Sequence, residues 1–92
     1  MAVTVRIPVA LRRQTGGLAT VQALGDTVAE VLVDLRRQFP GLGDLLFDED
    51  GSVKGFVNIY VDGDDIRYRN GLDTRVGDET EMMLLPAAAG GE

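Results

Sequence analysis

The stretch "GDTVAEVLVDLRRQFPG", residues 25–41, decides the fold of this 92-residue chain. Thr27 is a favourable helix N-cap, and Glu30 three residues later completes a capping box. Apolar residues then recur at the spacing of one helix face, at Val28, Val31, Leu32, Leu35 and Phe39. Pro40 and Gly41 end the pattern. The stretch predicts one amphipathic helix whose apolar face must be covered by a second layer.

Two segments before this helix alternate as half-buried strands do. In residues 3–9 ("VTVRIPV"), the odd positions through Val9 are apolar and are expected to face the core. Residues 18–24 ("LATVQAL") form the second predicted strand. The segment between them contains Gly16 and Gly17, which favour a turn. We therefore expect a hairpin closed by a short loop.

The region after the helix alternates in the same way. Leu42, Leu45 and Leu46 predict one short helical turn against the core. Strands are expected over 56–61 and 80–86, and Asp62-Gly63 after the first of them is a hairpin turn signal.

These elements predict an α+β fold in two layers, with a mixed four- to five-stranded sheet packed on one main helix. The first and last strands are the most apolar, so we place them side by side and parallel in the centre. That arrangement is the β-grasp, or ubiquitin-like, fold. The expected organisation is one domain over residues 1–86 and a flexible tail over 87–92 that contains Gly-Gly.

Composition excludes several kinds of function. The chain has no cysteine and no histidine, which removes thiolate nucleophiles, imidazole catalysis and Cys/His metal sites. Its net charge of −6 disfavours nucleic-acid binding. We expect a cytoplasmic monomer without a signal peptide or membrane span. The acidic loop at 48–52 lacks the ligand spacing of an EF-hand, so no metal is expected.

Three segments together resemble the MoaD/ThiS family of ubiquitin-like sulfur carriers. They are "GDTVAEVLVDLRRQFPGL" (25–42), "FVNIYVDGDDIR" (56–67) and "VGDETEMMLLPAAAGG" (76–91), in the family's order. The likeness spans nearly the whole chain and is strongest to the actinobacterial CysO branch, whose members share a start like "VTVRIPVALRRQTGG" (3–17).

The resemblance implies a protein co-substrate rather than an enzyme. An E1-like adenylating enzyme of the MoeB, ThiF or MoeZ type uses ATP to activate the Gly91 carboxylate, and a sulfur donor converts it to a thiocarboxylate. A sulfur-accepting synthase then takes the sulfur for cysteine, thiosugar or cofactor synthesis. The carrier itself binds no cofactor and contributes no catalytic residue.

The tail has the composition that such a role requires. Ala87, Ala88, Ala89, Gly90 and Gly91 carry the smallest side chains, so they fit a narrow channel into a partner's active site. Glu92 departs from the family, which ends on the second glycine, and it blocks adenylation at Gly91. Either a zinc metallopeptidase removes Glu92 or the residue is a remnant of cloning.

Period-two alternation also predicts a partner-docking patch on the open face of the sheet. Met82 and Leu84 should face the helix, which turns the next residues outward. The patch comprises Phe56, Tyr60, Met83, Leu85 and Pro86, and we expect Arg6 and Arg67 at its rim.

Two other functions remain open at this point. One is a ubiquitin-like modifier joined through Gly91 to protein lysines; Lys54 is the only lysine on which self-linked chains could grow. The other is an interaction module whose tail has no role, since β-grasp domains serve many purposes.

Overall fold

The computed structural model describes residues 2–51 and 57–86, with the side chains of Val57 and Pro86 excepted. Its strands are β1 (Ala2–Arg6), β2 (Thr20–Leu24), β3 (Val57–Val61), β4 (Asp64–Asp65) and β5 (Glu81–Pro86). The helices are α1 (Val28–Gln38) and α2 (Pro40–Leu46), with short 3-10 helices η1 (Val9–Thr15), η2 (Ile66–Tyr68) and η3 (Gly71–Asp73).

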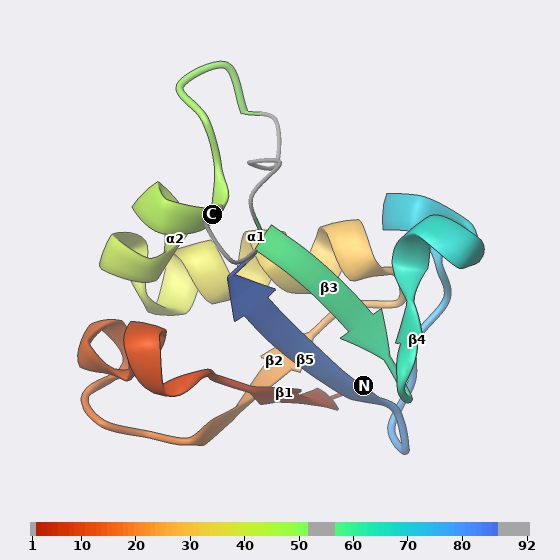
Figure 1. The fold of residues 1–92 in the computed structure, drawn as a ribbon, viewed down its shortest axis with the longest axis horizontal. Coiled ribbons are helices and arrows are strands. Elements are labelled where there is room, and N and C mark those ends of the chain that lie inside the picture. Colours follow the sequence, from red (N-terminus) through yellow and green to blue (C-terminus); the bar gives the residue numbers. More distant parts are fainter. Residues whose placement is uncertain (1, 52–56, 87–92) are drawn as a thin grey trace.

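The five strands form one mixed sheet in the order β2-β1-β5-β3-β4. β1 and β5 run parallel in its centre, with Thr4 opposite Glu81 and Arg6 opposite Met83. The other pairs of neighbouring strands are antiparallel. Figure 1 shows α1 and α2 together behind the sheet, which leaves its other face open. The predicted β-grasp arrangement is confirmed.

The core lies between α1 and the sheet. All four predicted core residues within α1 are fully buried, and Phe39 packs against their edge as a partly buried residue. Met82 and Leu84 of β5 are fully buried as well, and so are Leu42 and Leu46 of α2. The apolar face of α1 and the alternate inward residues of β5 therefore pack against each other in one core, as predicted.

The connection between β1 and β2 differs from the predicted short loop. β1 ends at Arg6, and residues 9–15 form the 3-10 helix η1, so Val9 is 75% exposed instead of buried. Pro8 precedes this helix with extended backbone, and it has no N–H to continue the strand ladder. Gly16 then adopts the left-handed conformation (φ 68°) that ends η1.

The start of α1 is capped as predicted, with one difference. The Thr27 Oγ1 accepts the Glu30 N–H at 3.3 Å, but the Glu30 carboxylate accepts the N–H of Asp26 at 2.7 Å and not that of Thr27. The backbone here is also bonded to the segment before β5, since Val28 N–H donates to Thr74 O and Val76 N–H donates to Asp26 O. The cap therefore also anchors the chain that leads into the central strand.

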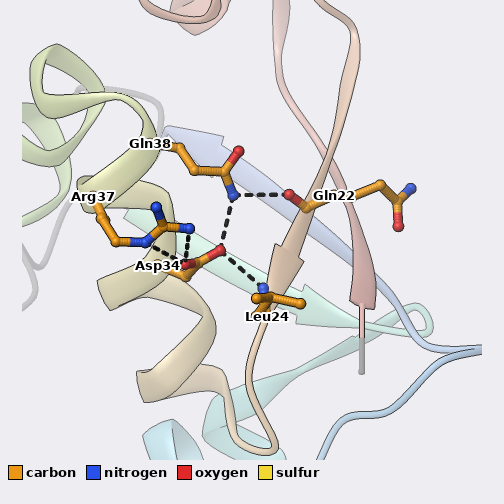
Figure 2. A network of polar contacts seen from close by, with 5 residues as sticks. All are labelled: Gln22, Leu24, Asp34, Arg37 and Gln38. Atoms are coloured by element: carbon orange, nitrogen blue, oxygen red, sulfur yellow. Dashed lines mark hydrogen bonds and ion pairs between the residues drawn. The ribbon is translucent and has the colours of Figure 1, made fainter.

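Asp34 joins α1 to the outer edge of β2, a link that the sequence did not reveal (Figure 2). Its carboxylate accepts the Leu24 N–H at 2.9 Å, the Gln38 amide at 2.8 Å and the Arg37 guanidinium at 2.7 Å. Gln38 also donates to Gln22 O at 2.9 Å. Two backbone groups on an edge strand are thereby bonded to the helix and are closed to strand addition.

Burial favours the neutral form of Asp34 and by itself raises the pKa of this carboxyl. The hydrogen bonds from Leu24, Arg37 and Gln38, with the charge of Arg37, outweigh that effect and hold the pKa below its usual value. Asp34 is therefore ionised at neutral pH although it is almost completely buried.

Truncating Leu35 tests the packing of α1 on the sheet. Leu35→Ala should lower the free energy of unfolding by about 2–5 kcal/mol, because it leaves a cavity at a fully buried position. Urea unfolding at neutral pH measures the change. Val33→Ala on the same helix is the control, since Val33 is 52% exposed and should change stability by less than about 0.5 kcal/mol. Equal effects of the two variants would contradict the assigned helix face.

Replacing Asp34 tests its bond to the edge strand through pH. Asp34→Asn should cost about 1–3 kcal/mol at pH near 7, because hydrogen bonds to a charged acceptor are lost. The pKa of Asp34 is lower in the folded state than in the unfolded state. Its contribution to stability is therefore complete at pH values above the unfolded-state pKa of about 3.9, and it is lost as the pH falls through the folded-state pKa. Urea titrations of both proteins from neutral pH to about pH 3 should show the difference shrinking at the acid end. A difference independent of pH would contradict the ionised network.

Candidate functional site

The open face of the sheet carries an apolar strip formed by Met83 and Leu85 of β5 and Tyr60 of β3. Met83 lies between Arg6 of β1 and Tyr60 of β3 in one row across three strands, and Leu85 lies opposite Asn58 in the next row. Met83 and Tyr60 are partly exposed, and Leu85 is 37% exposed. Their neighbours Met82, Leu84, Ile59 and Val61 are buried on the helix side. The alternation that places these three residues outward is therefore as predicted.

Not every member of the predicted patch can be placed. Phe56 and the side chain of Pro86 lie outside what the structure describes, and so do all predicted tail residues from Ala87 to Gly91. The backbone of β5 is described to Pro86, which pairs with Val57. The strip of Tyr60, Met83 and Leu85 thus runs directly to the point where the tail begins.

The two predicted rim arginines are both held by carboxylates. Arg6 lies beside Met83 and pairs with Glu81 at 3.3 Å, with both side chains about half exposed. Arg67 lines the same shallow hollow as Tyr60 and binds Asp65 with two guanidinium nitrogens, Nη2 at 2.7 Å and Nε at 3.2 Å. The Arg67 side chain and its N–H hold the pKa of the Asp65 carboxyl below its usual value. Asp65 therefore fixes Arg67 beside the patch.

Sequence reasoning missed two exposed apolar residues in the connection between β1 and β2. Val9 at the start of η1 is 75% exposed, and Leu18 in the same connection is 51% exposed. Ile7 N–H donates to Ala19 O, which brings the two ends of this connection together beside the end of β1. Pro8 was the available signal, because it ends the alternation that had placed Val9 in the core.

Among the residues that the structure describes, no group of three or more Asp, Glu, His or Cys side chains is arranged to hold a metal ion. None of the helices within residues 2–51 and 57–86 is long and apolar enough to span a bilayer. The open face carries an apolar strip and flanking ion pairs, an arrangement suited to binding another protein.

Comparison with known proteins identifies the family. The model of the ThiS family matches residues 5–91. The chain belongs to the ThiS family. The match ends at Gly91 and leaves Glu92 outside it.

Individual relatives agree with this assignment. The chain is 44% identical to the sulfur carrier protein CysO of Mycobacterium tuberculosis, over 99% of this chain and all of the relative. It also matches the CysO solved in complex with BexX from Amycolatopsis orientalis, with a TM-score of 0.86 and 41% identity over 98% of this chain and 100% of the other. The small archaeal modifier protein 1 of Methanosarcina acetivorans is 31% identical, with a TM-score of 0.87 over 98% and 96% of the two chains. As a member of this family the chain is a small carrier and not an enzyme.

Proposed function

We propose that this protein carries sulfur on its backbone terminus, as a thiocarboxylate at Gly91. A carboxylate oxygen of Gly91 attacks the α-phosphorus of ATP in an E1-like adenylating enzyme, and pyrophosphate leaves. Sulfide supplied by a donor then attacks the acyl carbon of the AMP ester, and AMP leaves with one former carboxylate oxygen. The resulting thiocarboxylate is the nucleophile that delivers sulfur to a substrate in an acceptor synthase.

The observation that carries this proposal is the position of β5. It is the central strand, hydrogen-bonded to β1 on one side and β3 on the other, and its backbone ends at Pro86 beside the apolar strip. Five residues without a side chain larger than a methyl group follow, up to Gly91. A rigid strand therefore presents a thin segment, and similarity to CysO proteins supports sulfur as its cargo.

Glu92 must be absent before the proposed chemistry can begin. While Glu92 is attached, the Gly91 carbonyl is an amide and offers no carboxylate to ATP. The family match ends at Gly91, which supports Gly91 as the working terminus. A zinc metallopeptidase is the proposed route of removal where Glu92 is native.

Binding by the tail alone is weak because ordering its backbone costs roughly 1–2 kcal/mol per residue. We propose that the strip of Tyr60, Met83 and Leu85 supplies the missing affinity by packing on the adenylating enzyme and on the acceptor synthase. The crystal structure of a CysO relative in complex with BexX supports a protein partner for the carrier.

The first prediction concerns the chain terminus. A chain ending at Gly91, incubated with its E1-like enzyme, ATP and sulfide, should gain the mass of one oxygen-to-sulfur exchange in intact-mass spectrometry. The chain that retains Glu92 should not react, and it serves as the control because the folded domain is the same. A folded Gly91-ended chain that never forms an AMP ester or a thioacid would overturn the proposal.

The second prediction concerns the strip. The double variant Met83→Ala/Leu85→Ala should raise the KM for the carrier in adenylation by roughly tenfold, since truncated anchor residues typically cost 1–2 kcal/mol or more of binding. Initial rates of pyrophosphate release measure it. Leu72→Ala removes an exposed apolar side chain from η3, outside the sheet, and should leave KM unchanged. An unchanged KM in the double variant would exclude the strip as the docking surface.

A protein modifier is the alternative that one comparison favours, namely the similarity to the archaeal modifier protein. Both functions need the same activation and differ in the nucleophile that attacks the acyl group. Larger adducts on other proteins, joined from Gly91 to lysine, would favour the modifier in the same mass experiment.

A further inference from the structure

The connection between β1 and β2 lies at the end of the sheet from which the tail departs. β1 and β5 are parallel, with Arg6 opposite Met83. Three residues after Arg6 the chain begins η1 at Val9, and three residues after Met83 strand β5 ends at Pro86. Figure 1 shows η1 and the arrowhead of β5 toward the same end of the sheet. Val9 and Leu18 in this connection are the exposed apolar residues described above.

The short tail forces a partner onto this region. Gly91 is the fifth residue after Pro86, and a fully extended chain of five residues spans roughly 16–18 Å. An enzyme that holds Gly91 at an enclosed reaction centre must therefore bring its surface close to the end of β5. The structural elements next to that end become part of the contact.

The β1–β2 connection differs in charge from the other segments at the ends of the sheet. The connection over residues 7–19 contains two arginines, Arg12 and Arg13, and no acid. The segments at the opposite end, 25–27, 62–63 and 75–80, contain four acids and one arginine, Arg75. Asp48, Glu49 and Asp50 precede β3, whose first residue pairs with Pro86, so acids lie on the tail end as well. Arg12 Nε donates to Ile7 O at 3.1 Å, while the exposed Arg13 has no carboxylate within ion-pair distance among the described residues.

We propose that the β1–β2 connection, with Val9 as apolar anchor and Arg13 as charged contact, docks on the rim of the adenylating enzyme's tail channel. This inference rests on the proposed function. The rim that fits is apolar opposite Val9 and acidic opposite Arg13, because an exposed arginine without an ion-pair partner among the described residues is complementary to negative charge.

Two pairs of variants test the contact in chains that end at Gly91. Val9→Asp is matched by Val33→Asp, since both residues are exposed and each change adds one negative charge. Arg13→Glu is matched by Arg75→Glu, which alters an exposed arginine close to the helix N-cap, away from the tail. Circular dichroism and urea unfolding identify the folded variants that enter the kinetic comparison.

The readout is the KM for the carrier and the kcat of AMP-ester formation, measured by pyrophosphate release with the cognate E1-like enzyme. Val9→Asp and Arg13→Glu should each raise KM at least tenfold with kcat within twofold, while the matched controls stay within twofold in both. The effect of Arg13→Glu should diminish as salt is raised, because the pair is exposed.

Two results would overturn the inference, and they differ. If the unaltered chain is adenylated and the Val9 and Arg13 variants behave like their controls, the docking contact is wrong and the proposed function stands. If the unaltered chain is never adenylated, the proposed function fails and the contact fails with it.

Discussion

β1 and β5 lie parallel in the middle of the sheet, and a parallel pair cannot be joined by a tight turn. The chain must leave β1, build α1 across one face and return through β3 before β5 can take its place. This requirement explains why the apolar face of α1 and the buried residues of β5 form one core. It also means that β1 and β5 end toward the same side of the sheet, where η1 follows β1.

The same topology leaves two edges that must not recruit other strands. At one edge, Asp34 and Gln38 of α1 bond backbone groups of β2 at Leu24 and Gln22. At the other, β4 has only two residues. Short or covered edges are a common protection against aggregation. These protected edges leave the open face and the β1–β2 connection, with the exposed residues Leu85 and Val9, as the surfaces that we propose for partners.

Sequence patterns predicted the elements whose periodicity extends over many residues. The spacing from Val28 to Leu35 indicated the buried helix face, and the alternation in β5 oriented Met83 and Leu85 correctly. The same reasoning failed at Val9, because the alternation of apolar and polar residues does not show where a proline ends the hydrogen bonding between two strands. It also could not find the role of Asp34, because a helical spacing does not reveal which strand N–H a buried carboxylate will meet. The outward strip was thus predictable, whereas the exposure of Val9 on η1 required the coordinates.

In the proposed function, the Gly91 carboxylate itself is activated and then carries the sulfur. The most direct test labels both oxygens of that carboxylate with a heavy oxygen isotope and analyses the AMP released when sulfide is added to the adenylated chain. We expect one heavy oxygen in the phosphate of AMP and the other in the thiocarboxylate. Unlabelled AMP released together with a newly formed thioacid would contradict it, because sulfur would then have arrived without an acyl-adenylate at Gly91.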